Sequence, residues 1–421
     1  MVYQPPAGAR DLLPLDVTQK RWIEERLQQI FHRWGYHRII TSTLERLDTL
    51  MAGGAIQRST VIQLNNLDDE VLGLRPELTA SIARTAVTRM AGATYPQRLY
   101  YNTNVFRRAQ EGSHSGQQEF YQAGVELLGG GGLLADAEIL LLLIDCLNNL
   151  GLGQLKSSSD ASWSLILGEA GLTRSLLSPF PTHLRDKVRY AIAQLDRLAL
   201  EALSLSTELR DRALLLLDLR GNPADVIQRV SSLDLDDTQR ESVNNLKSLI
   251  ELLQESLDLR LGDSTIALPI ILDLSLIRTF DYYTGIVFEV ASTTALGQKV
   301  LGQGGRYDQL LGLFHPQGES IPGIGFSLQM EQLHQILLPT GQLPNQTPAS
   351  DWLVVSETPQ THAIAFAHAQ RLRESTHPLQ VELDLSGTSR DAIRDYARRR
   401  GIAQIVWMDI NGSPIDETLT R

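Results

Sequence analysis

Two strand-like segments around a polar loop constrain the fold of this chain more than any other feature. The first is QRLYYNTNVFRRAQ (97–110), the second is EFYQAGVELLG (119–129), and EGSHSGQQ (111–118) lies between them. Stretches of aromatic and β-branched residues bounded by glycine and polar residues are typical of strands. The three segments together predict a long-looped antiparallel hairpin. Arg107 and Arg108 then lie at the end of its first strand.

Helix and strand patterns alternate on both sides of this hairpin. Residues 17–34 carry apolar side chains at helical spacing, with polar residues between them, and this pattern predicts an amphipathic helix. We expect a β-branched strand over 37–45, and then a helix over 74–90 in which Pro76 is an early residue. A glycine run follows the hairpin and leads into an apolar helix around Cys146.

The second half of the chain predicts a helical insertion, further strands and a separate C-terminal module. The pattern is helical almost throughout 175–260, strands return between 266 and 292, and a glycine-bearing strand runs into a helix over 321–337. Residues 337–350 carry three prolines and no charge, which is the composition of a linker. The pattern over 351–421 predicts a βαβαβ unit.

Composition and motif content exclude several classes of protein. Cys146 is the only thiol, so one chain forms neither a disulfide nor a cysteine metal site, and we expect a reducing, cytoplasmic compartment. The N-terminal segment is not a signal peptide, and no stretch reaches the roughly 18 apolar residues that span a bilayer. The net charge of -11 disfavours nucleic acid as a partner. HExxH, G-x-S-x-G and P-loop motifs are absent, so no metal, cofactor or serine hydrolase site is predicted.

Three segments supply polar residues suited to an amino-acid or nucleotide ligand. Glu77 in LRPELT suits an ammonium group and Thr79 a hydroxyl contact, although the helix dipole alone favours a glutamate at a helix start. Arg107 in VFRRAQ can bind a phosphate or carboxylate in a bidentate manner, although arginines before a loop are commonly solvated. Gln122 and Glu126 share one face of their strand. If that face lines a pocket, Glu126 can bind an imidazole or another cation.

A fourth segment, LIRTFDYYTGIVFEV, adds Arg278, Asp281, Tyr282 and Tyr283 ahead of an apolar strand. Adjacent residues of an extended chain point to opposite faces, so at most one of the two tyrosines is expected in a pocket. The glycines of GGRYDQL (304–310) permit a close approach of the backbone.

In their order and separation, these segments resemble those of class II histidyl-tRNA synthetases over about residues 5–335, and DYYTGIVFE followed by GGRYDQL is the most specific part. The resemblance implies an α+β fold, with an antiparallel sheet and flanking helices formed by 1–170 and 261–336. A helical insertion over 171–260 and a shortened anticodon-binding-like α/β module over 351–421 complete the chain. The residues on histidine-pocket positions of that family are Glu77, Thr79, Gln122, Glu126, Tyr282 and Tyr283, while Arg107 and Arg278 fall on arginines that face the carboxylate and the α-phosphate.

The sequence departs from that family on the nucleotide and tRNA sides. Gln332 stands where the third class II motif has an arginine over the γ-phosphate, and Ala109 stands where a glutamate helps to orient ATP. Loss of one such arginine can lower the rate of phosphoryl chemistry by about 10³ to 10⁵. The module over 351–421 has 8 arginines, no lysines and 10 acidic residues, so we do not expect it to bind tRNA.

A synthetase-like chain with these losses resembles the regulatory subunits of short-form ATP phosphoribosyltransferases. The resemblance implies a non-catalytic protein that forms a homodimer, joins the short catalytic subunit in a hetero-oligomer, and takes part in histidine feedback on the first step of histidine biosynthesis. Two alternatives stay open, a divergent but working histidyl-tRNA synthetase and a free-standing histidine-binding sensor. ATP–pyrophosphate exchange would reveal the first, and failure to retain a catalytic subunit would favour the second.

Overall fold

The computed structural model divides the chain into two compact units, Met1–Pro344 and Asn345–Arg421, which are treated separately below. It describes residues 4–54, 56–65, 70–108, 116–153, 163–261, 268–276, 282–294 and 297–419. Within these ranges, no helix is long and apolar enough to cross a membrane.

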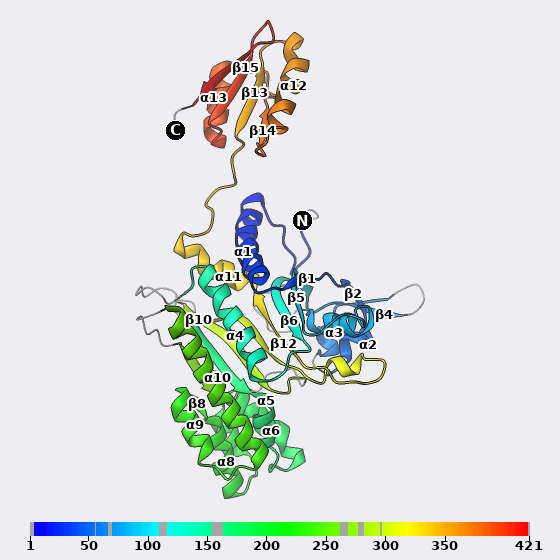
Figure 1. Ribbon diagram of the computed structural model, residues 1–421, viewed down its shortest axis with the longest axis vertical. Coiled ribbons are helices and arrows are strands. Elements are labelled where there is room, and N and C mark those ends of the chain that lie inside the picture. The colour runs from blue at the N-terminus through cyan, green and yellow to red at the C-terminus, as the bar shows by residue number, and fades with distance from the viewer. Residues whose placement is uncertain are drawn as a thin grey trace. The chain divides into compact units, whose positions relative to one another are not determined.

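A nine-stranded sheet forms the centre of the first unit (Figure 1). In spatial order the strands are β1 (His37–Arg38), β5 (Gln97–Phe106), β6 (Glu119–Leu128), β12 (Gly323–Gln329), β11 (Gly297–Arg306), β10 (Ile286–Thr294), β7 (Trp163–Glu169), β9 (Ile270–Asp273) and β8 (Arg220–Gly221). The predicted hairpin is confirmed as the antiparallel pair β5–β6. The sheet is mixed rather than purely antiparallel, because β1 pairs with β5, and β7 with β9, in parallel.

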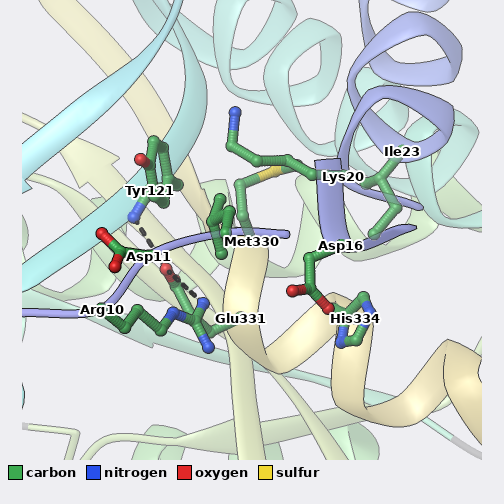
Figure 2. Close-up of a pocket in the computed structure, with 10 residues that line it drawn as sticks. Arg10, Asp11, Asp16, Lys20, Ile23, Tyr121, Met330, Glu331 and His334 are labelled. Carbon is green, nitrogen blue, oxygen red and sulfur yellow. Dashed lines mark hydrogen bonds and ion pairs between the residues drawn. The ribbon is translucent and has the colours of Figure 1, made fainter. Parts of the chain in front are cut away.

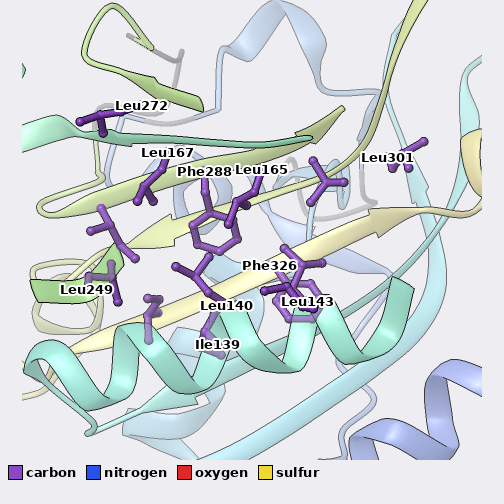
Figure 3. Packing of buried hydrophobic residues seen from close by; sticks show 14 of the residues in the cluster. Ile139, Leu140, Leu143, Leu165, Leu167, Leu249, Leu272, Phe288, Leu301 and Phe326 are labelled. Atoms are coloured by element: carbon purple, nitrogen blue, oxygen red, sulfur yellow. The ribbon is translucent and has the colours of Figure 1, made fainter. Parts of the chain in front are cut away.

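Helices that pack on one face of this sheet include α1 (Pro14–Arg33), α4 (Gly132–Asn149) and α11 (Met330–Leu337). The predicted helices over 17–34 and around Cys146 are confirmed as α1 and α4. Figure 3 shows side chains of α4, such as Leu140 and Leu143, packed against Phe288 and Phe326 of the sheet. Because strand side chains alternate, Ala123, Val125 and Leu127 of β6 join this core and leave the even-numbered positions for the other face.

The other face of the sheet packs against α3 (Thr79–Thr88), α2 (Leu47–Met51) and a small sheet of β2 (Leu44–Arg46), β4 (Val71–Leu74) and β3 (Gln63–Asn65). Two expectations are wrong here. The strand over 37–45 is interrupted, because the Arg75 guanidinium binds the main-chain carbonyls of Thr41 and Ser42. The helix begins at Thr79, so Pro76 precedes it.

The helical insertion consists of α5 (Ala170–Leu176), α6 (Thr182–Ala193), α7 (Arg197–Ala202), α8 (Thr207–Leu217), α9 (Pro223–Ser231) and α10 (Asp237–Leu261). Side chains of Asp196, Ser206 and Asn222 cap the first turns of α7, α8 and α9. The two-residue strand β8 lies between α8 and α9 and pairs with β9, which ties the insertion to the edge of the sheet.

The second unit is a small α/β sheet of order β14-β13-β15-β16. Its elements are β13 (Trp352–Ser356), α12 (His362–Arg373), β14 (Val381–Leu383), α13 (Arg390–Arg400), β15 (Gln404–Met408) and β16 (Pro414–Thr418). The predicted βαβαβ pattern is confirmed, and the antiparallel strand β16 is an addition. Leu353 and Val355 pack with α13, whereas Val354 packs with α12, as alternation along β13 requires.

Candidate functional site

The structure brings most of the predicted site residues together in one small polar cavity of about 30 Å³. It lies on the face of the large sheet opposite the α4 core, because Gln122 of β6 and Ser327 of β12 line it, whereas Ala123 and Leu328 of the same strands join that core. We call it the polar cavity. Its lining residues are Glu77, Thr79, Tyr101, Arg107, Gln122, Tyr282, Tyr283, Gln303, Gly304, Tyr307, Gly325, Phe326 and Ser327.

Glu126 is fully buried beside this cavity and is held by two hydroxyl groups. The Thr79 hydroxyl donates to its Oε1 atom at 2.7 Å, and the Tyr307 hydroxyl donates to Oε2. A Cβ atom on Gly325 of the facing strand would overlap the carboxylate, so a glycine is required there. Burial raises the pKa of Glu126 to about 8 against the opposing effect of both hydrogen bonds. The carboxyl group is therefore mainly protonated at neutral pH.

Glu77 and Arg107 form the charged end of the polar cavity. The backbone N–H groups of Thr79 and Ala80 donate to the Glu77 carboxylate at 2.5 and 3.0 Å, which places Glu77 at the start of α3. Burial nevertheless raises the pKa of Glu77, and it lowers the pKa of Arg107. Arg107 donates from Nε to the Pro76 carbonyl at 3.0 Å, so it lines the cavity and is not a freely solvated arginine.

Both Tyr282 and Tyr283 line the polar cavity, so the expectation that at most one would do so is wrong. Alternation does not apply to them, because they precede β10, which begins at Ile286. Their ring centroids are 4.8 Å apart, and the Arg174 guanidinium holds the Tyr283 carbonyl at 2.9 Å. Burial raises the pKa of both phenols, so they remain neutral hydrogen-bonding groups.

Sequence reasoning missed several residues of the lining, including Tyr101, Gln303, Tyr307, Phe326 and Ser327. A signal existed for two of them. Tyr307 is part of GGRYDQL, and Tyr101 lies opposite Gly124, between Gln122 and Glu126 on the predicted hairpin. The positions of Gln303 and Ser327 depend on the pairing of β11 with β12, where the two residues face each other.

The segment of the third class II motif, 329–332, carries two neutral amides, Gln329 and Gln332. Gln122 donates from Nε2 to Oε1 of Gln329 at 3.2 Å, and the Gln332 Oε1 atom is buried with no hydrogen-bond partner in the described part of the chain. Arg278 and Ala109 lie outside the described residues. No group of three or more His, Cys, Asp and Glu side chains in the described ranges could hold a metal ion.

Comparisons with known proteins agree on one family. Residues 8–333 match the family model of histidyl-tRNA synthetase. Over the full length of both chains, the protein is 67% identical to an ATP phosphoribosyltransferase regulatory subunit of Nostoc punctiforme and 65% identical to one of Trichormus variabilis. The chain belongs to the family of ATP phosphoribosyltransferase regulatory subunits.

Solved structures place the fold of this regulatory subunit with the synthetases. A Bacillus halodurans structure described as an ATP phosphoribosyltransferase regulatory subunit/histidyl-tRNA synthetase superposes with a TM-score of 0.77 at 27% identity, and the match covers 97% of this chain and 98% of the other. A histidyl-tRNA synthetase from Nostoc sp. shares the fold with a TM-score of 0.74 at 20% identity, covering 99% and 97%.

The predictions of family, fold and regulatory role are therefore confirmed. The chain is a regulatory subunit of ATP phosphoribosyltransferase, an enzyme of histidine biosynthesis, and not its catalytic chain. Neutral Gln332 at the position of the synthetase arginine agrees with this role.

Proposed function

We propose that the polar cavity binds histidine, and that its occupancy is the signal which this regulatory subunit passes to the catalytic subunit. The observation that carries the proposal is the enclosure of two carboxyl groups and one arginine in a single buried site. Glu77 is placed to accept the ammonium group, Arg107 to pair with the carboxylate, and Glu126 to bind the imidazole. By the family resemblance, Arg278 joins Arg107 at the carboxylate end.

Histidine binding on these groups involves a proton. An imidazolium ion is stabilised by an ionised Glu126, whereas burial keeps this carboxyl group mainly protonated below about pH 8. A free imidazole is mainly neutral at about pH 7. The Glu126 proton therefore passes to the bound ring, and the ion pair forms with little net release of a proton. The Thr79 and Tyr307 hydroxyls already point at the carboxylate oxygens, so they are preorganised for the ionised form.

The size of the polar cavity implies that binding changes the structure. A volume of about 30 Å³ holds roughly two water molecules, which is less than an amino acid needs. Tyr282 and Tyr283 line the cavity and precede β10, and we propose that their rings move to admit the ligand. Different free and bound conformations are what a regulatory subunit requires, because a ligand shifts an equilibrium only when it prefers one state.

The assembly that we propose contains a homodimer of this chain and the short-form catalytic subunit. Ile40 is 78% exposed. Two further apolar side chains in the N-terminal part of the sequence, Leu44 and Leu64, are also exposed. Apolar surface of this kind supports a protein contact. A single buried Cys146 fits the reducing cytoplasm, where we place the complex.

One reconstitution tests the proposal. The purified chain is mixed with a short-form catalytic subunit, and ATP phosphoribosyltransferase activity is measured across histidine concentrations. We expect the chain to raise activity and histidine to inhibit the mixture. Glu126→Gln should raise the half-inhibitory histidine concentration at least about tenfold, because a buried charge-assisted contact is worth roughly 1.5–3 kcal/mol.

The exposed carboxylate of Glu251 provides the matched control, Glu251→Gln, which should behave as wild type. Equal inhibition of the wild-type and Glu126→Gln mixtures would show that histidine acts elsewhere. Absence of any activation by the wild-type chain would favour the free-standing sensor, and ATP–pyrophosphate exchange by the chain alone would favour a working synthetase.

A further inference from the structure

A second cavity, of about 110 Å³, lies on the helix-covered face of the large sheet. We call it the helix-side cavity. Its lining residues are Arg10, Asp11, Leu12, Asp16, Lys20, Ile23, Tyr121, Met330, Glu331 and His334. Figure 2 shows that they come from the segment before α1, from α1 itself, from β6 and from α11. The cavity is back to back with the polar cavity, because Tyr121 adjoins Gln122 along β6 and alternation places the two on opposite faces.

The buried carboxylate of Glu331 lines the helix-side cavity, and only one of its two oxygens has a hydrogen-bond donor among the described residues. Its Oε1 atom accepts the backbone N–H of Tyr121 at 3.0 Å and lies 3.6 Å from the Arg10 guanidinium (Figure 2). Its Oε2 atom is buried with no hydrogen-bond partner among the described residues, and the side chain is only 9% exposed. Buried polar atoms are almost always paired, so this oxygen is suited to a donor supplied by a ligand.

Two cations lie at the same cavity. The Arg10 side chain is 56% exposed and contacts Glu331 only at long range, so its other N–H groups are available to an anion. The Lys20 ammonium forms an ion pair with Glu24 and lies 4.3 Å from the centroid of the Tyr121 ring. A ligand in this cavity therefore meets an unpaired carboxylate oxygen and two basic side chains together.

His334 adds a further acceptor. Its Nε2 atom is 2.7 Å from Oε1 of Gln19, and the amide of Gln19 is oriented by a hydrogen bond from Nε2 to the Pro344 carbonyl. Because Oε1 of Gln19 only accepts, the His334 proton is on Nε2, and Nδ1 retains its lone pair. Burial and the nearby Arg10 lower the pKa of His334, which keeps the ring neutral.

We propose that the helix-side cavity binds a small ampholyte, a primary ammonium group joined through one to three carbon atoms to a carboxylate, as in a small α-amino acid. The ammonium group donates to Glu331 Oε2, and the carboxylate pairs with Arg10 and Lys20. A cavity of about 110 Å³ has room for roughly four water molecules at their liquid volume, which matches a molecule with a few non-hydrogen atoms. The inference does not depend on histidine binding in the polar cavity.

Calorimetric titration of the full chain with four probes tests this assignment. Glycine and L-serine carry both charged groups, ethanolamine lacks the carboxylate, and glycolate lacks the ammonium group. We expect the two amino acids to bind measurably and each single-ended probe to bind at least tenfold more weakly. Glu331→Gln should weaken the binding of glycine and serine at least tenfold. Arg10→Gln should weaken the binding of both amino acids and leave the binding of ethanolamine unchanged.

The variants separate binding from folding and from the other cavity. Glu331→Gln keeps an acceptor for the Tyr121 N–H group, and Arg10 precedes α1 at an exposed position, so its loss leaves the core intact. Glu126→Gln alters only the polar cavity and should leave the glycine and serine titrations unchanged. The proposal is overturned if no probe binds, if ethanolamine or glycolate binds as tightly as serine, or if Glu331→Gln and Arg10→Gln both bind serine like the wild type.

Discussion

The pKa of Glu126 can be tested without a ligand, through the pH dependence of stability. Folding raises its pKa from an ordinary value of 4.5 to about 8. Between these values the carboxyl group is protonated in the folded chain and ionised in the unfolded chain, so the free energy of unfolding falls as the pH rises. The whole effect is on the order of 5 kcal/mol.

Glu126→Gln removes this titration. We therefore expect the variant to gain stability relative to the wild type as the pH rises from about 5 to about 8.5, by up to several kcal/mol on the same linkage argument. Urea unfolding at a series of pH values measures the difference, with Glu251→Gln as the control for loss of a carboxylate. Parallel stability profiles for wild type and Glu126→Gln would contradict the raised pKa.

Gln332 allows a second test at the scale of one residue. If the synthetase site had lost only this arginine, Gln332→Arg would restore much of the adenylation rate. Such an arginine contributes a factor of roughly 10³ to 10⁵ to the rate of phosphoryl transfer. Ala109 replaces a second ATP-orienting residue, so we expect the variant to show no histidine-dependent ATP–pyrophosphate exchange above background. Exchange at a rate that depends on both substrates would instead identify a synthetase inactivated by a single change.

At the scale of elements, the C-terminal end of α6 stores backbone strain. Leu195 follows the helix with a φ of 54°, the only non-glycine residue of the described ranges with a positive φ. The N–H groups of Leu195 and Asp196 bind carbonyls of Ile192 and Ala191, which is the arrangement that favours glycine at this position. The leucine side chain is 43% exposed, so little packing offsets the strain.

Leu195→Gly should therefore stabilise the protein by up to about 1 kcal/mol, since the left-handed conformation costs a leucine about 1–2 kcal/mol and glycine loses part of that gain through its entropy when unfolded. Leu195→Ala removes the same side chain but keeps the Cβ atom, and should give no gain. The midpoint of urea denaturation measures both. Equal effects of the two variants would mean that the side chain, not the backbone, decides the outcome.

Elements with one regular buried face were predictable, and those fixed by distant polar contacts were not. The helix α1 and the hairpin β5–β6 follow directly from side-chain period. The break near Thr41 depends on Arg75, which is more than thirty positions away in sequence, and α3 begins late because Glu77 captures its first N–H groups. The local pattern near Thr41 does not reveal its distant partner Arg75. Glu77 is local to α3, but its presence near the helix start does not show at which residue the helix begins.

In the polar cavity too, some residues could be predicted from the sequence and others could not. Glu77, Gln122 and Glu126 could be proposed from residue type and spacing, supported by a family resemblance. The pairing of Tyr282 and Tyr283 in one lining could not, because it depends on where β10 begins. Alternation of side chains holds within a strand, and Tyr282 and Tyr283 lie just before β10.

At the scale of the whole molecule, charge decides whether a synthetase-like fold can still hold tRNA. The net charge of -11 opposes the phosphate backbone, and most of the arginines of α13 already pair with carboxylates of their own unit. Arg394 pairs with Glu417 at 2.7 Å, Arg398 with Asp395 at 3.0 Å and Arg400 with Glu382 at 3.3 Å. Arginines held by carboxylates release few counterions from a nucleic acid, and counterion release supplies most of non-specific affinity.

We therefore expect no binding of tRNA below about 10 µM protein at about 150 mM salt, the range in which even non-specific binders associate. Fluorescence anisotropy of labelled tRNA measures this directly. The double variant Glu357→Gln/Glu382→Gln frees Arg390 and Arg400 from their partners and reduces the negative charge by two, so it should bind more tightly than the wild type at low salt and lose that gain as salt rises. Tight, salt-resistant binding by the wild-type chain would mean that tRNA is recognised through a surface other than α13. That result would support the alternative of a working histidyl-tRNA synthetase.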